Sequence, residues 1–392
     1  MSSLPSIDEA LALVLARALP LAAEDVPVAL AAGRVVVELA LAVTDLPPFD
    51  SSAMDGYAVR AGDTPGTLTV VGHSAAGKPE ARSLGVGEAI VISTGAVVPD
   101  GADAVVPVER TSGDLKVEGV SPGENIRPRG GDARTGDVIV EHGDRLRPAQ
   151  LGALAAAGVV TVRCGRRPRV SVLATGSELR SPGEQLAPGE IYESNTVMLA
   201  AQLESAGADV TVLHAVNDDE RATRAALERG VESDVLVTSG GVSVGPHDLV
   251  RGALVELGAE EVFWRVAVRP GKPIAFAVRG ETLVFGLPGN PVSSLVGFEL
   301  FVRPALLALQ GARDPGPAYL PGRLGATVRR NDSRDDLLRA RARIEDGAVV
   351  LDPLSGQESH MIVRSAAASA LVLVPRGTGE LAEGAQVSYL RI

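Results

Sequence analysis

This 392-residue chain has a single cysteine, five histidines and few aromatic residues. One cysteine, Cys164, excludes an intrachain disulfide and any zinc site that uses several cysteines, and this favours the cytosol. Cys164 lies in an alternating run, residues 158–165, that predicts a strand and hence a packed thiol rather than a nucleophile. The histidines show neither metal-ligand spacing nor an H-E-x-x-H motif. The sequence therefore supports no histidine–metal chemistry, and it supports no serine-hydrolase chemistry either.

An excess of positive charge is also missing. The formal net charge is −12 and aromatic residues make up 3% of the chain, so the basic surface and the stacking platform that nucleic-acid binding requires are absent. No apolar stretch is long enough to cross a bilayer, and we expect no membrane partner. An anionic substrate has to be held by local Arg and Lys clusters or by helix N-termini, which makes such clusters informative.

The N-terminal segment is rich in Ala and Leu, as in a secretion signal, but Asp8, Glu9 and Arg17 interrupt it and no basic segment precedes it. Ser6 and Glu9 have the spacing of a capping box. Apolar residues recur at helical spacing, which predicts an amphipathic helix. The predicted apolar face consists of Leu11, Val14, Leu15 and Leu19.

The chain exceeds the usual size of one domain, and its composition changes along its length. Residues 43–140 are rich in Gly, Pro, Val and Thr with short apolar runs, which predicts an all-β module. From residue 169 onward strands alternate with Gly-rich turns and helices, which indicates an α/β sandwich with a largely parallel sheet. A Pro/Gly-rich linker at 311–317 then leads to short strands and a small C-terminal β domain.

We therefore expect a multidomain α/β plus β protein. The predicted units are an α/β domain (1–19 and 163–313), a discontinuous linking domain (20–42 and 137–162), a β-rich domain (43–136) and a C-terminal β-barrel-like domain (314–392). Within the α/β domain, strands are predicted at 170–174, 209–213, 234–238, 261–268, 274–278 and 282–286, and helices at 195–207, 219–229, 248–257 and 292–309.

Two loops of the α/β domain are suited to anions. The first follows an apolar strand and contains Ser239, Gly240, Gly241 and Gly245 before Asp248. Glycines let backbone N–H groups approach phosphate oxygens at the carboxyl end of a sheet, which favours a phosphate-bearing ligand. The alternative is a tight turn in which Asp248 only caps the next helix.

The second loop runs through Pro288, Gly289, Asn290 and Pro291 directly into the predicted helix 292–309. It presents a helix N-terminus, which suits an anion. A structural connector is nearly as well supported, because proline at a helix start is common without any ligand.

Positive residues cluster between these loops. Arg265 and Arg269 are four apart, which would place them on one face of a strand, and Lys272 lies at the following turn. In a chain this acidic, such a ridge favours an anionic ligand over a merely solvated face.

Carboxylates in polar or Gly-rich loops are the remaining signal. Oxygen ligands from several loops suit Mg²⁺, which bridges to phosphates. The alternative is that each carboxylate only caps a helix or turn. The candidates are Asp55, Asp132, Glu178 and Asp218.

Several phrases of the sequence, in this order, resemble the MoeA family of molybdopterin molybdenumtransferases and the related E domain of gephyrin. The longest is Asp-Leu-Pro-Pro-Phe-Asp-Ser-Ser-Ala-Met-Asp-Gly-Tyr-Ala-Val. The phrases lie at residues 45–59, 93–96, 123–127, 238–245, 272–273 and 286–291. The resemblance spans nearly the whole chain and implies an α/β domain like that of the MogA proteins.

The resemblance implies that adenylylated molybdopterin and molybdate react, with Mg²⁺ as the divalent cation, to give molybdenum cofactor and AMP. It implies catalytic roles for Asp55, Asp132, Glu178, Asp218, Asp248 and Lys272, of which Glu178, Asp218 and Asp248 are the expected metal ligands. It also implies ligand-binding roles for Thr94, Arg127, Ser239, Gly240, Gly241, Gly245, Arg265, Arg269, Pro288, Gly289, Asn290, Pro291, Arg339 and Ser359.

In the family, residues of the β-rich domain close the site of the partner subunit, so the resemblance implies a homodimer. It also suggests contact with an upstream adenylyltransferase and with downstream molybdoenzymes, in the cytoplasm. The family often has lysines where this chain has Arg265 and Arg269, which keeps the charge but changes the hydrogen-bond geometry. Two alternatives are a molybdopterin adenylyltransferase, which has a similar α/β domain, and a non-catalytic binding or scaffold protein.

Overall fold

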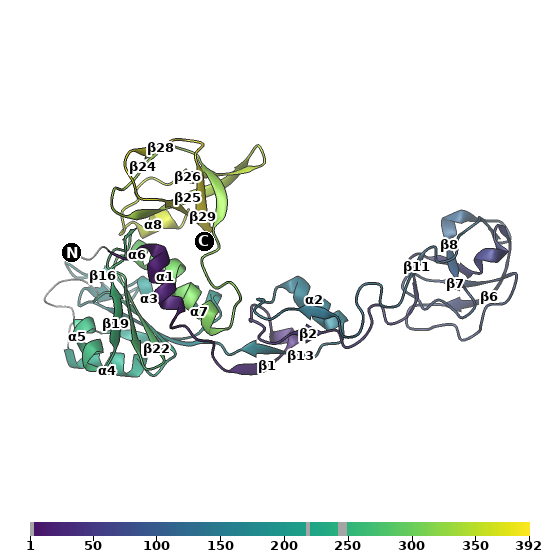
Figure 1. The fold of residues 1–392 in the computed structure, drawn as a ribbon, viewed down its shortest axis with the longest axis horizontal. Coiled ribbons are helices and arrows are strands. Elements are labelled where there is room, and N and C mark those ends of the chain that lie inside the picture. Colours follow the sequence, from purple (N-terminus) through teal and green to yellow (C-terminus); the bar gives the residue numbers. More distant parts are fainter. Residues whose placement is uncertain (1–3, 217–219, 242–248) are drawn as a thin grey trace.

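The computed structural model describes residues 4–216, 220–241 and 249–392. The molecule is elongated (Figure 1). An α/β unit and a C-terminal β unit lie together at one end, a β-rich unit lies at the other, and a small linking unit connects them. This arrangement matches the multidomain α/β plus β organisation expected from the sequence.

The α/β unit is built on a six-stranded sheet with the order β17-β14-β18-β22-β21-β19. The first four strands are parallel, and β21 and β19 are added antiparallel at one edge. The strands are β14 (Arg169–Thr175), β17 (Asp209–Val216), β18 (Val235–Ser239), β19 (Glu260–Trp264), β21 (Ala275–Arg279) and β22 (Thr282–Leu287).

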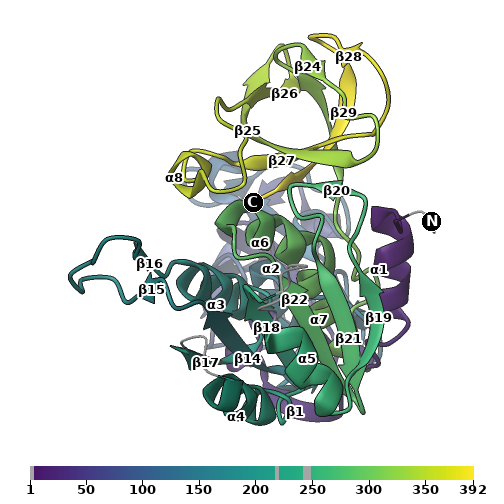
Figure 2. The same cartoon turned by 90° about the vertical axis from the view of Figure 1, so that its left-hand side faces the viewer.

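Helices cover both faces of this sheet (Figure 2). One layer contains α1 (Ile7–Leu15), α3 (Asn195–Ser205), α6 (Pro291–Gly297) and α7 (Arg303–Leu309), and the other contains α4 (Glu220–Gly230) and α5 (Leu249–Glu256). Both faces of the central strands are buried, which explains why those strands are continuous apolar runs rather than alternating ones. In β18, Val235 and Val237 pack into one core and Leu236 into the other.

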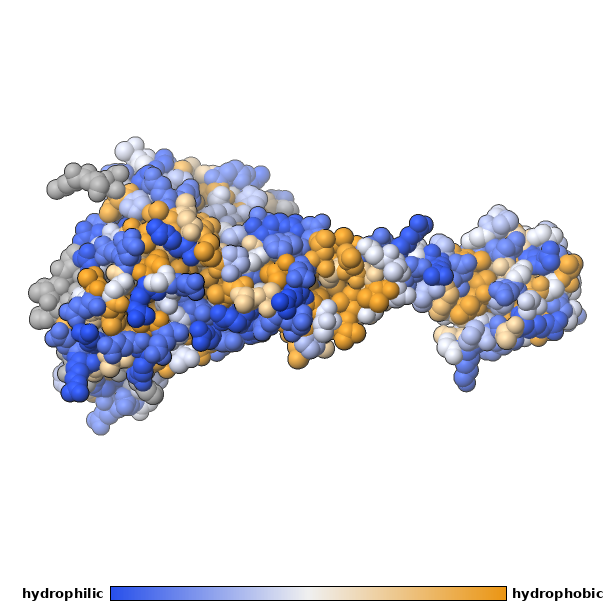
Figure 3. Space-filling model, turned by 60° about the horizontal axis from the view of Figure 1, so that its bottom comes forward, coloured by the Kyte–Doolittle hydropathy of each residue, from blue (hydrophilic) through white to orange (hydrophobic). Residues whose placement is uncertain are grey.

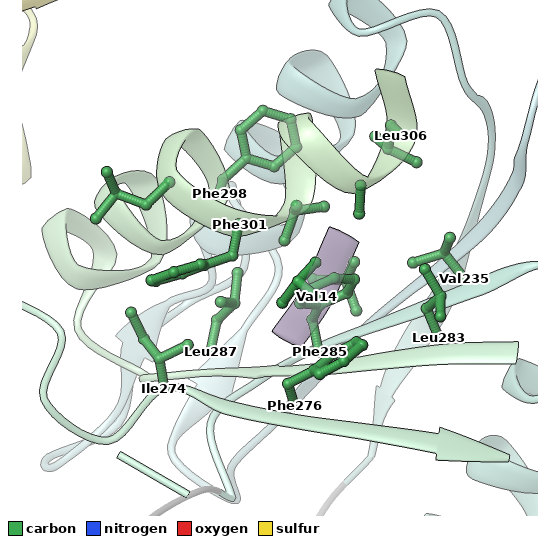
Figure 4. Close-up of a cluster of buried hydrophobic side chains, with 14 of the residues drawn as sticks. Val14, Val235, Ile274, Phe276, Leu283, Phe285, Leu287, Phe298, Phe301 and Leu306 are labelled. Atoms are coloured by element: carbon green, nitrogen blue, oxygen red, sulfur yellow. The ribbon is translucent and has the colours of Figure 1, made fainter. Parts of the chain in front are cut away.

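The larger core lies beneath α6 and α7 (Figure 4). Phe276 and Phe285 stack with ring centroids 5.0 Å apart, and Phe263 contacts Phe276 and Phe301. These rings are almost fully buried, and aromatic burial of this kind dominates core energetics. The core fixes the sheet against the helix whose first residues reach the candidate site.

The helical run from Pro291 to Leu309 corrects the expectation that no apolar stretch is long enough to cross a bilayer. It has 19 residues and a mean hydropathy of 1.6, so by length and composition it is able to cross a membrane. However, 78% of the tested window is buried inside the protein. Its apolarity is that of a core helix surrounded by other elements, and a π-helical turn, η4 (Phe298–Val302), divides it into α6 and α7.

The linking unit combines segments from both sides of the β-rich unit. Strand β1 (Ala23–Pro27) pairs antiparallel with β13 (Thr161–Gly165), and β2 (Ala40–Leu41) pairs with β12 (Val138–Val140). Helix α2 (Pro148–Ala156) lies beside these strands.

The β-rich unit contains a four-stranded sheet with the order β6-β7-β4-β8 and two smaller sheets. Its apolar residues form two cores separate from that of the α/β unit. The strands are β3 (Ser51–Ser52), β4 (Gly56–Val59), β5 (Gly66–Thr67), β6 (Thr69–Ser74), β7 (Glu88–Ile92), β8 (Ala104–Pro107), β9 (Thr111–Ser112), β10 (Lys116–Val117) and β11 (Ile126–Arg127).

The C-terminal unit is a closed barrel, because β25 pairs with both β26 and β27 and the ring continues through β23 and β29. A strand from the α/β unit, β20 (Val268–Arg269), adds to it beside β25. The barrel elements are β23 (Leu320–Leu324), β25 (Asp335–Glu345), β26 (Ala348–Pro353), β27 (Ala370–Val374) and β29 (Gln386–Arg391), with β24 (Val328–Arg329), β28 (Glu380–Leu381) and α8 (Ile362–Ser365) outside the ring.

Three local expectations can be compared with the structure. The capping box at α1 is confirmed: Glu9 N donates to Ser6 Oγ at 3.2 Å and Ser6 N donates to Glu9 Oε2 at 2.7 Å. The predicted apolar face is wrong at Leu19, which is 71% exposed because the helix ends before it. Cys164 is a buried thiol in β13, as expected, and burial raises its pKa.

Asp234 ties the start of β18 to the preceding segment. Its carboxylate accepts bonds from Arg166 Nη1 and Nη2 at 2.8 and 3.0 Å and from the Arg169 amide at 2.7 Å. Burial opposes ionisation, but these bonds outweigh it and lower the pKa of Asp234 to about 2. The stabilisation is present above the unfolded pKa and is lost as pH falls through the folded one.

We therefore predict that Asp234→Asn lowers the stability of the chain by about 1–2 kcal/mol at neutral pH. The difference in thermal midpoint between the variant and the wild type should be constant above about pH 5 and should shrink between about pH 4 and pH 2. Thermal unfolding of both proteins across this range checks it. A difference that does not change with pH would show that the charge of Asp234 contributes nothing.

Candidate functional site

The predicted anion loops follow neighbouring parallel strands. Residues 176–178 follow β14, the Ser239–Gly241 turn follows β18, and the loop 288–291 follows β22. The carboxyl ends of parallel strands meet at one edge of a sheet, where ligands of open α/β folds bind. Gly245, Asp218 and Asp248 lie outside the described residues.

One asparagine connects two of these loops. The side-chain amide of Asn195, the first residue of α3, donates from Nδ2 to Ser239 Oγ and to Gly289 O, both at 2.7 Å. Gly240 N also donates to Leu287 O at 3.1 Å. Ser239 is 2% exposed, so its hydroxyl holds the two loops together rather than facing solvent.

The backbone of the first loop requires glycine. Gly240 and Gly241 have φ values of +88° and +64°, a conformation that L side chains rarely adopt. A Cβ at Gly240 would lie 2.6 Å from Thr175 O, and one at Gly241 would lie 2.4 Å from Val250 Cγ2. The close approach of the chain at this point is therefore built into the sequence.

The first backbone N–H groups of α6 already donate hydrogen bonds within the protein. Val292 N donates to Ser359 O at 3.0 Å, and the amides of Ser293 and Ser294 donate to Asn290 O at 3.0 and 3.1 Å. The bond to Ser359 joins the helix to the barrel. The loop 288–291 therefore shapes the site and connects two units, while these three N–H groups are not available to an anion in this conformation.

A cleft of about 620 Å³ lies where the α/β unit meets the barrel. Its α/β wall contains Arg269 and Lys272 together with Pro288 and Asn290. The barrel wall contributes Arg334, Leu337, Leu338, Gln357, Glu358, Ser359 and His360. The structure thus brings together five of the predicted residues, namely Arg269, Lys272, Pro288, Asn290 and Ser359.

The cleft is rich in cationic groups. Lys272 is exposed, and neither its ammonium group nor the guanidinium of Arg334 makes a hydrogen bond or ion pair within the described ranges. Arg269 is paired with Asp336. Positive groups of this kind, with unused donors, suit a phosphate or another tetrahedral oxyanion.

Arg265 does not join this cluster. Strand β19 ends at Trp264, and Arg265 has a φ of +83°. The chain then leaves the sheet, so that Arg269 pairs in register with Asp336 of the barrel. The expectation that Arg265 and Arg269 share one face of a strand from 261 to 268 is wrong, because the strand is broken between them.

Arg339 is fully buried beneath the barrel wall of the cleft. Its guanidinium donates to Met361 O and Gly356 O at 2.6 Å, to Ser365 Oγ at 3.0 Å and to Glu358 O at 3.2 Å. These acceptors belong to the segment that presents Ser359 and His360 to the cleft. Arg339 therefore holds this segment in place, and it does not line the cleft itself.

We predict that Arg339→Met destabilises the chain by about 3 kcal/mol, because it leaves three partly buried carbonyls and the buried Ser365 hydroxyl without their donor. Binding of the molybdate that the sequence resemblance implies should also weaken, since Ser359 loses its fixed position. Thermal unfolding and titration with molybdate check the two effects. Arg341→Met is the matched control, because Arg341 lies in the same strand with an exposed side chain; equal effects of both variants would contradict this role of Arg339.

The residues predicted in the β-rich unit are not close to the cleft of the same chain. Asp55 Oδ1 accepts a bond from Thr94 N at 2.8 Å, which places these two residues together. Arg127 and Asp132 have exposed side chains. All four lie in or beside the β-rich unit, at the opposite end of the molecule from the barrel (Figure 1).

The predicted metal site is only partly described. Glu178 is exposed, and it follows β14 at the base of a projecting arm formed by β15 (Leu179–Arg180) and β16 (Ile191–Tyr192) (Figure 2). Over residues 4–216, 220–241 and 249–392, no three His, Cys, Asp or Glu side chains form a group able to hold a metal ion. The described residues alone therefore do not make a divalent-cation site.

Sequence reasoning did not identify Arg334, Asp336 and His360. Arg334 and His360 line the cleft together with Lys272, and Asp336 pairs with Arg269, only because the barrel docks on the α/β unit. No spacing rule predicts that contact. Asp336 carried no usable signal, because β25 begins with two aspartates and contains three arginines further along, so its sequence does not mark this carboxylate as the buried one.

The open α/β sheet carries a Gly-rich turn at its strand ends, and the neighbouring loop 288–291 lines a cationic cleft. This arrangement defines a protein that binds an anionic, phosphate-bearing ligand. Comparison with known proteins is consistent with this class. Residues 5–158 match the MoeA N-terminal region (domain I and II), residues 171–308 a probable molybdopterin binding domain, and residues 321–392 the MoeA C-terminal region (domain IV). The chain belongs to the MoeA family.

Relatives with known names are similar over most of their length. Molybdopterin molybdenumtransferase 2 of Mycobacterium tuberculosis is 38% identical over 92% of this chain and 93% of its own. Molybdopterin molybdenumtransferase of Haemophilus influenzae is 35% identical over 91% of each chain. A solved molybdopterin biosynthesis MoeA protein of Pyrococcus horikoshii has a TM-score of 0.80 and 32% identity, covering 100% of this chain and 99% of that one.

Proposed function

We propose that this chain is a molybdopterin molybdenumtransferase, which inserts molybdate into adenylylated molybdopterin and releases AMP. The observation that carries the proposal is the cleft lined by Arg269 and Lys272 of the α/β unit and by Arg334 of the barrel. Membership of the MoeA family supports molybdopterin as the phosphate-bearing anion, and we propose molybdate as the second anion. The cleft supplies the chemistry that a tetrahedral oxyanion next to a phosphate ester requires.

The proposed roles follow from position. Lys272 and Arg334 bind the oxyanion with side-chain donors that have no partner among the described residues, and Arg269 contributes from the adjacent wall. The Ser239–Gly241 turn positions the phosphate end of the pterin, because its glycines permit close backbone approach. Cleavage of the phosphoanhydride leaves charge on the departing AMP, and the same cations stabilise that charge.

Mg²⁺ is part of the proposal, with Glu178, Asp218 and Asp248 as its ligands. When bound, it neutralises charge on the phosphate oxygens. Support comes from the positions of these carboxylates in sequence, each following a strand of the parallel part of the sheet.

We also propose a homodimer in which the β-rich unit of one chain completes the site of the other. The support is the separation of Asp55, Thr94, Arg127 and Asp132 from the cleft of their own chain (Figure 1). A second support is apolar surface on the linking unit (Figure 3). There, Leu30, Leu39, Leu41, Val138 and Val160 are 70, 57, 45, 50 and 77% exposed, and apolar patches of this kind mark contact surfaces.

The test is AMP release by the purified full-length protein from adenylylated molybdopterin with Mg²⁺, with and without molybdate. We expect release that depends on molybdate. An adenylyltransferase would instead consume ATP with molybdopterin, and a scaffold protein would do neither. No release by a folded, dimeric protein would overturn the proposed transferase activity.

A further inference from the structure

The α/β unit and the barrel are joined by a short parallel strand pair that borders the cleft. Val268 and Arg269 of β20 pair in register with Asp335 and Asp336 of β25. Asp335 N also donates to Ala267 O at 3.0 Å. This seam places Asp336 directly beside the cleft residue Arg269.

Asp336 is a buried charge. It is 0% exposed, whereas the side chain of Arg269 is 48% exposed at the cleft wall. One carboxylate oxygen accepts a hydrogen bond from Arg269 Nη2, and the other, Oδ1, has no partner in the described part of the chain. Burial raises the pKa of Asp336 above its ordinary value, and the nearby cations Arg269 and Arg334 offset only part of this rise. A buried carboxylate is costly unless it is paired, so its attraction for Arg269 is strong.

We propose that Asp336 is a positioning residue for the oxyanion cleft, which holds the guanidinium of Arg269 against the wall so that its remaining N–H groups face the ligand. The inference rests on the proposed function of the cleft and deepens it. It concerns a residue that does not itself line the cleft.

The chemistry of arginine explains how one side chain serves both partners. A guanidinium has five N–H groups in a rigid planar fork, so bonding to Asp336 leaves donors for an oxyanion. A free arginine side chain would lose rotamer freedom on binding the ligand, whereas one already held by Asp336 has lost it on folding. The pairing therefore preorganises the site.

The effect of removing the Asp336 charge on anion affinity distinguishes a positioning role from a purely electrostatic one. A negative charge near the cleft weakens anion binding, so its removal alone should strengthen binding. If Asp336 positions Arg269, its removal should weaken binding despite that gain. Glu358 provides the comparison, because it is an exposed carboxylate at the same cleft with no bond to Arg269.

The experiment is titration of the full-length protein with inorganic molybdate by calorimetry. Asp336→Asn should raise the dissociation constant about three- to tenfold. Glu358→Gln, which removes the same charge, should lower it up to about twofold. Tighter or unchanged binding in Asp336→Asn would overturn the proposal.

A double-mutant cycle separates positioning from general damage to the fold. Once Arg269→Met has removed the guanidinium, adding Asp336→Asn should weaken molybdate binding no further. Thermal unfolding should show that the double variant is more stable than Arg269→Met alone, because that variant leaves a buried charge unpaired. Additive losses in binding would refute positioning. Absence of molybdate binding in the wild type would instead defeat the proposed function.

Discussion

Replacing Lys272 by methionine should lower kcat/KM for molybdate by about a hundredfold or more. Lys272 lines the cleft, is exposed, and makes no hydrogen bond or ion pair with its side chain among the described residues. Its charge is therefore free to act on the ligand. Loss of one donor that stabilises developing charge typically costs 10²–10³ in rate, and methionine keeps most of the side-chain length.

The fold should tolerate this change, because no hydrogen bond or ion pair in the described part of the chain depends on the ammonium group. The thermal midpoint of Lys272→Met should stay at the wild-type value, and molybdate-dependent AMP release should be measured on the same sample. Lys116→Met is the matched control, since Lys116 is an exposed lysine in β10 of the β-rich unit. Wild-type activity in both variants would show that the cleft is not the reaction site.

The sequence predicted the local features of the site well, because short-range rules control them. A strand that ends in Ser-Gly-Gly has to turn sharply, and Gly240 and Gly241 adopt the positive φ that such a turn requires. The parallel order of β14, β18 and β22 follows from the alternation of strands and helices. Together they place the loop 288–291 beside the Ser239–Gly241 turn.

The cleft itself could not be predicted in this way. It forms where the barrel contacts the α/β unit, and Arg269 reaches it only because the chain leaves the sheet after Trp264. Periodicity assumed one continuous strand and therefore grouped Arg265 with Arg269. Arg339 shows the same limit. The family resemblance implied a ligand-binding role for it, but only the packed structure reveals that its guanidinium donates to backbone carbonyls.

Whether an apolar helix crosses a membrane or packs in a protein core depends on the elements around it, which the sequence alone does not show. By length and mean hydropathy, the helix from Pro291 to Leu309 is apolar enough to span a bilayer, yet most of it is buried within the protein. The residue boundaries of the four units stay predictions, and so do the roles of Gly245, Asp218 and Asp248.

The β-rich unit and the barrel have separate apolar cores, and these explain why the composition changes along the chain.

The second large effect concerns the shared site. Asp132 is exposed beside the β-rich unit and Lys272 lines the cleft at the other end of the molecule (Figure 1). We predict that Asp132→Asn and Lys272→Met each lower molybdate-dependent AMP release by about tenfold or more, because each removes a charged group from every site. Neither substitution should prevent dimer formation, which size-exclusion chromatography with light scattering will show.

When the two variants are co-expressed, activity should return. In a mixed dimer, the intact cleft of the Asp132→Asn chain faces the intact β-rich unit of the Lys272→Met chain, so one of its two sites is whole. Random pairing makes half of the dimers mixed, and about a quarter of the wild-type activity is expected. If each site came from a single chain, every site would carry one substitution and the mixture would stay as inactive as its components. Recovery therefore requires that the β-rich unit of one chain act on the cleft of another.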